Sequence, residues 1–272
     1  MVNLVLAAVL AAAAPQPAAT EAVEPAEPAM FVVRDADTTV YLFGTFHALD
    51  GKADWFRDEV RQAFDQSSEL VLETVVPDGP AVASAMPGSR RGQARFDPLP
   101  VTPSASFLGT TRLAINAGKS QGMTVGNGAD MVLRRAAELT GKHVEGLESL
   151  ESQFAMFRRM PLAPAAAAPR PGSPVGESAV DNLSKAMVDM QEAWKRGDQT
   201  IFVRMLGQLK ATSPAAYRMM FTERNGRWAD WIGARMQTPG TVFVAVGAGH
   251  LAGAYSLLVH LAQRGIESTR LN

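Results

Sequence analysis

Two histidines follow short apolar runs at the same spacing from a glycine. The segments Tyr41–His47 and Val242–His250 each read as an apolar strand followed by Gly-x-x-His. In α/β sheets, side chains at the carboxyl ends of strands converge on one edge, where ligands bind. Two imidazoles at that edge are able to share one ion, so His47 and His250 are candidate metal ligands. The alternative is two hydrogen-bonded histidines near strand ends.

A carboxylate supplies the third candidate ligand. Glu73 closes the apolar run Leu70–Leu72. Because a lone buried carboxylate is costly, it needs a cation or a set of donors. Two His and one Glu form a three-ligand site with open positions, where a metal activates water and polarises a carbonyl. One divalent ion is expected, Zn, Mn, Co or Fe. Three other roles are possible for Glu73: a general base, a helix cap or the partner of a salt bridge.

Three further charged residues are candidates for a role in the site or in the fold. Arg224 lies in a helical stretch with Trp228, either on a solvated face or as a cation for a substrate carboxylate or a developing oxyanion. Glu148 ends a strand, either as a general base in reserve or as the partner of a neighbouring Arg. Asp130 favours a helix N-terminus. Of the other two histidines, His143 at a turn is expected to be a surface residue, and His260 on a helix flank is expected to have no functional role.

The pattern of elements is α/β. An Asp35–Asp37 turn predicts a hairpin, and Asn127 and Gly141 are expected to cap and to end a helix. Stripes at helical spacing in the second half predict packed faces, including that of Ile201, Met205 and Leu209. The remaining expected elements are strands at Leu70–Glu73, His143–Leu147, Thr241–Val246 and Glu267–Leu271, and helices from about Asp54 and at Ala105–Ala117, Asp130–Leu139 and Ala254–Arg264.

The N-terminal segment and two low-complexity stretches indicate how the chain is organised. Met1–Ala14 is apolar except for Asn3, which suits the core of a secretory signal, although no Lys or Arg precedes Arg34. An Ala-rich tail is the alternative. We predict a signal peptide over residues 1–19, a Pro/Ala/Glu-rich linker over 20–30, and a single domain over 31–272 with a Pro-rich loop at 161–174. The mature protein is expected to be periplasmic or secreted, without a transmembrane span.

Composition excludes several classes. Lys and Arg number 26 against 27 Asp and Glu, with no basic face, so nucleic acid is not an expected partner. The chain has no Cys, which excludes disulfides, thiolate metal sites and cysteine nucleophiles. It also has no His-Glu-x-x-His helix, so zincin chemistry is excluded as a template.

The order of motifs resembles the TraB/GumN family from about Phe31 to Leu271. The motifs that carry the resemblance are Tyr41–His47, Glu73, Gly128–Asp130, Gly141–Glu148 with Gln153, Glu223–Asn225 with Trp228, and Val244–Gly253. The family is similar to the Tiki proteins, which are metal-dependent peptidases. The Pro-rich insertion and His143 depart from the family pattern.

The resemblance implies a central mixed β-sheet flanked by helices, with two related strand–GxxH halves and a helical middle segment. It maps the family's histidines, early Glu and later Arg onto His47, His250, Glu73 and Arg224. The expected function is an extracytoplasmic, metal-dependent hydrolase that cleaves a peptide or protein substrate by metal-activated water. Alternatives are a non-catalytic protein that binds a peptide, pheromone or small ligand, and an exopolysaccharide-related accessory protein.

Overall fold

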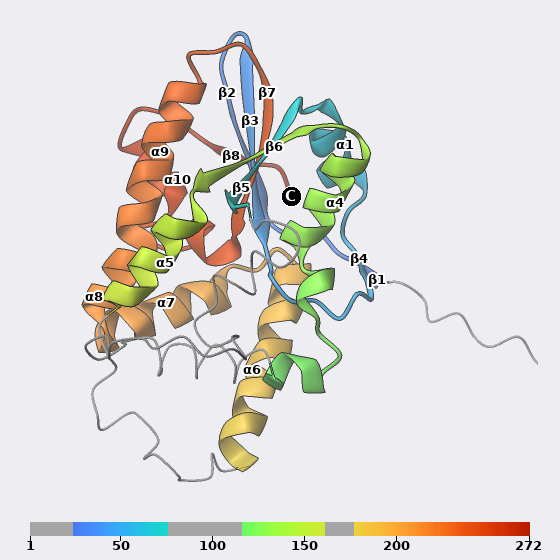
Figure 1. The fold of residues 1–272 in the computed structure, drawn as a ribbon, viewed down its shortest axis with the longest axis vertical. Helices are drawn as coiled ribbons and strands as arrows, with labels where there is room; N and C mark the ends of the chain where they lie inside the picture. The colour runs from blue at the N-terminus through green and yellow to red at the C-terminus, as the bar shows by residue number, and fades with distance from the viewer. Residues whose placement is uncertain (1–23, 76–115, 161–176) are drawn as a thin grey trace, which may run out of the picture.

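A six-stranded mixed β-sheet forms the centre of the computed structural model, which describes residues 24–75, 116–160 and 177–272 (Figure 1). The elements, in chain order, are β1 (Glu24–Pro25), β2 (Met30–Arg34), β3 (Thr38–Thr45), β4 (Ala53–Asp54), α1 (Asp58–Gln66), β5 (Glu69–Thr74), the 3-10 helix η1 (Val125–Asn127), α4 (Ala129–Leu139), β6 (His143–Glu148), α5 (Leu150–Arg159), α6 (Glu177–Lys195), α7 (Thr200–Thr212), α8 (Pro214–Tyr217), the π-helix η2 (Arg218–Thr222), α9 (Glu223–Arg235), β7 (Gly240–Gly247), the 3-10 helix η3 (Ala248–Leu251), α10 (Leu257–Ala262) and β8 (Thr269–Arg270).

The strand order brings the two ends of the chain together. It runs β6-β5-β7-β3-β2-β8, and β1 pairs separately with β4. Strand β7 lies between β3 and β5 and is parallel to both, while β2 is antiparallel to β3. The β3–β7 register runs from Thr38 opposite Gly240 to Thr45 opposite Gly247. Both Gly-x-x-His segments therefore leave the sheet at the same edge.

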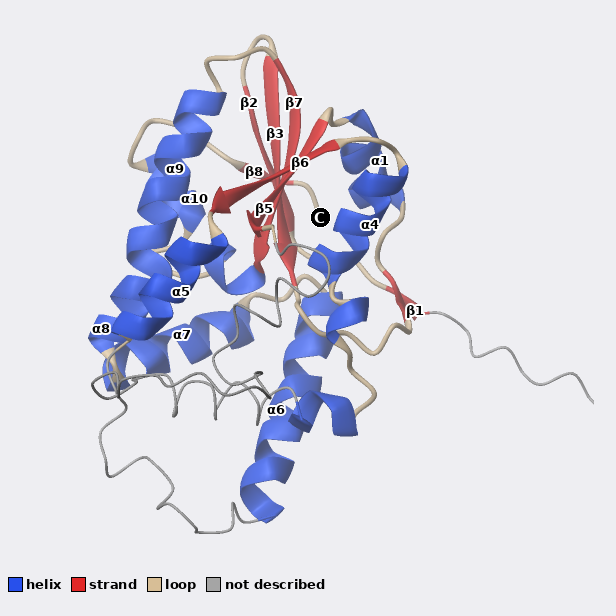
Figure 2. Cartoon of the chain, viewed as in Figure 1, coloured by secondary structure: helices blue, strands red, loops and turns tan. Residues whose placement is uncertain are grey.

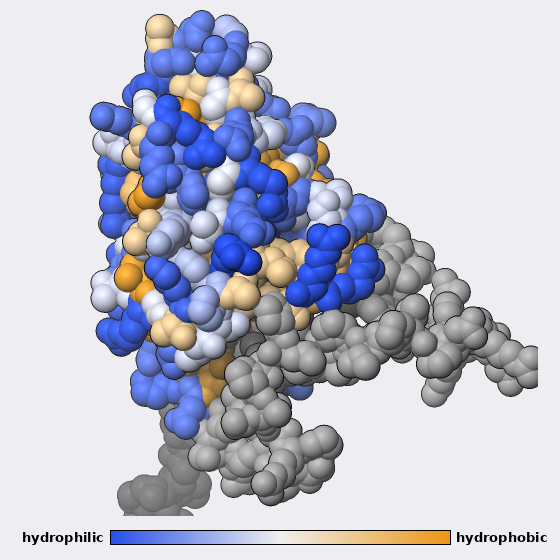
Figure 3. Space-filling view, turned by 90° about the vertical axis from the view of Figure 1, so that its left-hand side faces the viewer, coloured by the Kyte–Doolittle hydropathy of each residue, from blue (hydrophilic) through white to orange (hydrophobic). Residues whose placement is uncertain are grey.

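Helices cover both faces of the sheet (Figure 2). Along β7, Phe243 and Ala245 pack on the side of α1, α4 and α6, whereas Val242, Val244 and Val246 pack on the side of α9 and α10. Burial on both faces explains the continuous apolar run of this strand. The expected α/β fold with a mixed sheet flanked by helices is confirmed. Seen from the side of α9, the surface is mostly hydrophilic, with small scattered apolar patches (Figure 3).

Helices α6, α7 and α8 form the helical middle segment below the sheet. The side chain of Trp194, at the end of α6, is 2% exposed and donates its indole N–H to the carbonyl oxygen of Gly44 at 2.7 Å. This bond ties α6 to the first Gly-x-x-His segment. Among the helices within the described ranges, none is long and apolar enough to cross a membrane.

Several local predictions needed correction. Helix α1 begins at Asp58 rather than about Asp54, because Ala53 and Asp54 pair with β1 instead. Asn127 does not cap α4, since it belongs to η1 and Gly128 precedes the helix. The last helix and strand are shorter than expected, at Leu257–Ala262 and Thr269–Arg270.

The predicted packed stripe on α7 is wrong at one position, because Met205 is 41% exposed although Leu206 beside it is buried. Gly141 follows Thr140, the residue that caps the C-terminus of α4, and its φ of 68° agrees with the expectation that it ends this helix. Three predictions lie wholly or mostly outside the described residues: the signal peptide at 1–19, the helix at Ala105–Ala117 and the Pro-rich loop at 161–174.

Candidate active site

The ends of four parallel strands place the candidate residues in one cluster. His47 follows β3, Glu73 lies near the end of β5, Glu148 ends β6, and His250 lies in η3 directly after β7. Arg224 reaches the same cluster from α9, on the face of the sheet opposite α4. All five candidates from the sequence therefore meet at one sheet edge.

Gly247 marks the point on which three of them converge. A Cβ built on this glycine would lie 3.1 Å from Glu73 Oε1, 3.4 Å from His47 Nε2 and 3.8 Å from His250 Cδ2. The backbone N–H of Gly247 donates to Glu73 Oε1 at 2.6 Å. Because glycine has no Cβ, the strand end approaches these groups closely.

Arg224 lies between the two carboxylates. Its Nη2 donates to Glu73 Oε2 at 2.7 Å and its Nε donates to Glu148 Oε2 at 2.9 Å. The other oxygen of Glu148 accepts from Arg227 Nη2 at 2.8 Å. The side chains of Arg224 and Glu148 are 5% and 6% exposed, so these are buried, charge-assisted hydrogen bonds rather than surface pairs.

His250 is enclosed on every side. Its Nδ1 lies 2.6 Å from Asn225 Oδ1, and its Nε2 lies 3.2 Å from Arg224 Nη1 and 3.8 Å from Glu73 Oε1. The ring packs between those of Phe221 and Trp228, with centroids at 4.8 and 4.4 Å. Such a ring has little freedom to rotate, so the direction of its Nε2 is defined.

His47 has an acidic partner on α4. Its Nδ1 lies 3.2 Å from Asp130 Oδ1, which leaves Nε2 directed toward Gly247. The helix starts close to this histidine, because a Cβ on Gly128 would collide with the carbonyl oxygen of His47. Asp130 was expected only to favour the helix N-terminus. It also places a negative charge beside the imidazole.

The cluster changes the proton affinity of its members. The neighbouring carboxylates of Asp130 and Glu73 raise the pKa of His47 above its usual value. Burial, together with the charges of Arg224 and His47, lowers the pKa of His250 to about 3 against the opposing effect of Glu73. Burial opposes ionisation of Glu73, yet His250, Arg224, His47 and the Gly247 N–H hold its pKa well below the usual range.

Exposure increases across the cluster toward β3. The side chains of His250 and Glu73 are 6% and 13% exposed, whereas those of Asp130 and His47 are 25% and 59% exposed. The cluster is therefore most accessible to solvent on the side of His47.

The donor set suits a divalent cation. In both imidazoles Nδ1 lies beside an oxygen of a neighbouring side chain, at 3.2 Å in His47 and at 2.6 Å in His250. Nε2 then remains for the interior of the cluster, as in metal-ligating histidines. The carboxylate of Glu73 lies beside them. Within the described residues, however, no three His, Asp or Glu side chains already surround one point at ligand distances. Arg224 occupies the position beside His250 Nε2. The residues fit a cation held by His47, Glu73 and His250 once this guanidinium contact is given up.

Two residues of the cluster received no role from the sequence. Asn225 contacts His250, and Phe221 packs on its ring. Asn225 belongs to the Glu223–Asn225 motif, so its position next to Arg224 was the feature of the sequence that could have indicated a role in the site. Phe221 lies in the π-helix η2, and such distortions are frequent at functional sites.

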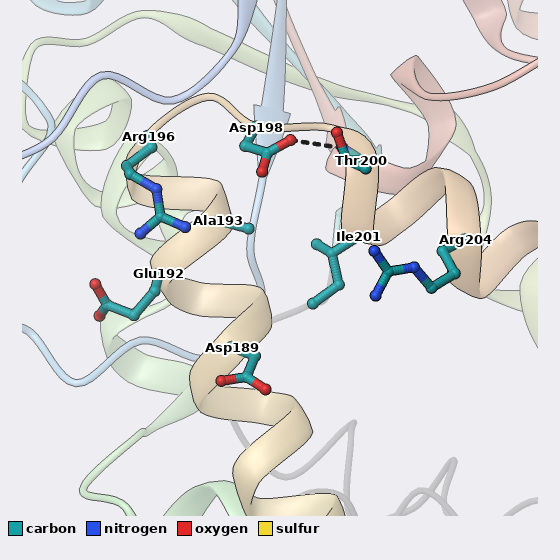
Figure 4. Close-up of a pocket in the computed structure, with 8 residues that line it drawn as sticks. All are labelled: Asp189, Glu192, Ala193, Arg196, Asp198, Thr200, Ile201 and Arg204. Carbon is teal, nitrogen blue, oxygen red and sulfur yellow. Dashed lines mark hydrogen bonds between the residues drawn. The ribbon is translucent and has the colours of Figure 1, made fainter.

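A hollow of about 410 Å³ lies elsewhere, between the end of α6 and the start of α7 (Figure 4). Arg196 and Arg204 line it together with Asp189 and Glu192, and Asp198 accepts a hydrogen bond from the backbone N–H of Thr200. Its charges have both signs, and none of the sequence candidates lines it. The hollow is therefore separate from the site predicted from the sequence.

The low pKa of His250 predicts a pH-dependent stability. Folded His250 stays neutral down to about pH 3, whereas the unfolded residue binds a proton below about 6.5. The unfolded state then binds more protons, so stability falls as the pH falls, by up to about 1.4 kcal/mol per pH unit. His47 contributes with the opposite sign, because its raised pKa keeps the folded residue protonated while the unfolded residue still takes up a proton between about pH 6.5 and 5. The wild type and His250→Gln share this contribution, so the difference between them reports on His250.

The measurement compares urea unfolding of the wild type and of His250→Gln in chelator across this pH range. The stability difference between the two is expected to shift against the wild type as the pH falls. A constant difference would show that folded His250 takes up protons as readily as the unfolded residue.

Comparison with known proteins agrees with the motif order. No curated protein and no solved structure was found to match the chain. The model of the TraB/PrgY/gumN family matches residues 29–94 and 88–270, which include both Gly-x-x-His segments. The chain belongs to the TraB/PrgY/gumN family.

Proposed function

We propose that this protein is a metal-dependent hydrolase that cleaves peptide bonds outside the cytoplasm. The observation that carries the proposal is the convergence of His47 Nε2, Glu73 Oε1 and the His250 ring on Gly247. These groups come from both ends of the polypeptide, and each imidazole has an oxygen of a neighbouring side chain beside its Nδ1. Packing alone does not require two imidazoles and a carboxylate to share this space.

A divalent cation in such a site lowers the pKa of a bound water and polarises a carbonyl. Glu73 suits a ligand better than a general base, because its lowered pKa makes it a weak proton acceptor and both of its oxygens already accept hydrogen bonds. Glu148 also has both oxygens engaged, by Arg224 and Arg227. In this proposal Glu148 acts through Arg224, whose orientation it determines.

Arg224 is the group that meets developing negative charge. A guanidinium remains protonated at every working pH and offers several N–H donors in one plane. Here two of its nitrogens bind Glu73 and Glu148, while Nη1 faces His250 Nε2 and the backbone oxygen of Met220 at 3.4 Å. Nη1 is therefore the nitrogen that turns to an oxyanion when His250 changes partner.

Location outside the cytoplasm rests on the apolar N-terminal segment Met1–Ala14. It is long enough for the core of a secretory signal and too short to span a membrane.

A second candidate function has its own support. The cluster satisfies its charges without a cation, because Arg224 pairs with both carboxylates and contacts His250. A site of this kind suits a protein that holds a peptide or another small ligand without cleaving it.

Removal of the metal tests the proposal. Purified protein is expected to carry about one divalent ion per chain by elemental analysis and to cleave members of a peptide library. A chelator is expected to stop cleavage, and returned Zn²⁺, Mn²⁺ or Co²⁺ to restore it, since the water needs the cation.

Robust cleavage in the presence of chelator would contradict the metal mechanism. Peptide retention without a cation and without cleavage would instead support the binding function. Protein treated with chelator and then reloaded with Mg²⁺ serves as a control, because Mg²⁺ prefers oxygen ligands to imidazole.

A further inference from the structure

Asn225 is almost completely enclosed beside the candidate site. It lies in the first turn of α9, next to Arg224, and is 1% exposed. Its Nδ2 donates to the carbonyl oxygen of Tyr255 at 2.7 Å, and its Oδ1 lies 2.6 Å from His250 Nδ1. The Tyr255 carbonyl accepts only, so it decides which end of the amide faces the histidine.

Two independent contacts give the same tautomer of His250. Asn225 presents an acceptor to Nδ1, so Nδ1 carries the proton. Arg224 presents only donors to Nε2, at 3.2 Å, so Nε2 carries the lone pair. A proton on Nε2 would face a guanidinium, and an unprotonated Nδ1 would face an amide oxygen.

The surroundings permit no alternative placement of the ring. Phe221 and Trp228 pack against the imidazole, and Arg224 lies over the Trp228 ring at 4.6 Å. A flipped ring would lose the Asn225 contact while remaining buried, and an unsatisfied buried group is costly.

We propose that Asn225 is a positioning residue that holds His250 as the Nδ1–H tautomer and thereby directs the Nε2 lone pair toward Arg224 and Glu73. Its role in the reaction rests on the proposed metal-dependent function. Asn225 does not touch substrate. It acts only through His250.

The local charges explain why residue 225 is an amide rather than a carboxylate. His47 has the carboxylate of Asp130 as its Nδ1 partner and is 59% exposed at its side chain. The enclosed His250 lies 3.8 Å from Glu73, which shares one buried guanidinium with Glu148. An amide accepts the Nδ1 proton without adding a third negative charge, and it also donates to Tyr255, which a carboxylate cannot do.

NMR of the ring nitrogens tests the assignment directly. The chain has four histidines, so the His250 signals are identified by their loss in His250→Gln. In cation-free protein near neutral pH, we expect a protonated Nδ1 with slow solvent exchange and an unprotonated Nε2. A protonated Nε2 in the wild type would overturn the proposal.

Two substitutions separate positioning from packing. Asn225→Leu keeps a similar volume but removes the acceptor, and it is expected to abolish the slowly exchanging Nδ1 proton. Asn225→Asp keeps an acceptor and is expected to retain that proton. Ser256→Ala is the matched control: Ser256 is 3% exposed and caps α10 near Tyr255, so its loss weakens the fold without changing the His250 signals.

Zn²⁺ titration connects the tautomer to the site. Loss of a residue that orients a metal-ligating histidine costs about 10- to 100-fold in metal affinity, which is the decrease expected for Asn225→Leu. Asn225→Asp is expected to bind Zn²⁺ more tightly than Asn225→Leu. An unchanged Nδ1 proton and unchanged Zn²⁺ affinity in Asn225→Leu would overturn the proposal.

Where Asn225→Leu does not fold, Asn225→Asp carries the test, and loss of the Nδ1 proton in this folded variant would overturn the assignment. Failure of the wild type to bind Zn²⁺ or any other divalent ion would overturn the metal-dependent function. The ring-nitrogen spectrum would still decide whether Asn225 determines the tautomer, so the two failures are distinguishable.

Discussion

Substitution of Arg224 by Met is expected to lower the free energy of unfolding by about 3–5 kcal/mol, because it leaves two buried carboxylates without their shared cation. Glu73 and Glu148 are 13% and 6% exposed at their side chains, and Arg224 donates to both. Urea unfolding by circular dichroism measures the effect, with fluorescence as a second probe of two-state behaviour.

Arg227→Met is the matched control for this prediction. Arg227 donates to the same carboxylate, Glu148, but its side chain is 60% exposed. Exposed ion pairs contribute little, so a loss of at most about 1 kcal/mol is expected. Equal losses in the two variants would contradict the idea that Arg224 is the buried centre of the network.

A triple variant identifies the cause of the loss. Glu73→Gln and Glu148→Gln remove the negative charges while keeping similar shapes and an oxygen acceptor. Combined with Arg224→Met, they are expected to recover part of the lost stability, because no buried charge then remains uncompensated. Coupling of this kind is measured by comparing the triple variant with the sum of its parts. Strict additivity would indicate that Arg224 acts through packing alone.

The sequence predicted the members of the site better than their contacts. Strand-end glycines and histidines identified His47 and His250, and the apolar strand before Glu73 identified the carboxylate. Their meeting depends on β7 lying between β3 and β5. That pairing joins segments about 200 residues apart, as with Thr38 and Gly240, and no local pattern encodes it.

The residues that contact His47 and His250 could not be predicted from the sequence, for a physical reason. An acidic residue is common in the first turn of a helix, so the position of Asp130 in α4 already explains its residue type. Nothing in the sequence then indicates that it also contacts His47. Asn225 carries no charge and has no distinctive spacing, so its role becomes visible only when the Tyr255 carbonyl and the His250 ring are placed around it. Residues that orient others are determined by tertiary geometry.

Local errors had similar origins. Asn127 has a suitable side chain for a helix cap, but the close approach of the backbone to His47 requires glycine at position 128, and the helix starts there. The expected start of α1 near Asp54 was wrong because that segment pairs with β1. In both cases a contact distant in the sequence outweighed a local preference.

His47→Ala and His250→Ala are each expected to remove the bound cation and peptide cleavage together. Each variant takes away one of three ligands, and the open coordination positions of a hydrolytic metal are useful only while the protein holds it. Elemental analysis and the peptide-library assay, run on the same preparations, measure the two losses. His143→Ala is the control, because His143 is 69% exposed and lies at the start of β6, at the opposite end of that strand from Glu148.

The fold must survive for this result to be informative, and the two histidines differ in that respect. His47 is largely exposed, so its removal is expected to change stability by less than about 1 kcal/mol, whereas removal of buried His250 leaves Asn225 and Arg224 short of a partner and costs about 1–3 kcal/mol. Loss of cleavage in folded His47→Ala is therefore the stronger evidence for the metal site, compared with the same loss in His250→Ala. If that variant kept both cation and cleavage, the shared metal site would be wrong. If it lost the cation but still bound peptide, and the wild type cleaved nothing, the cluster would be a ligand-binding site whose charges Arg224 already balances.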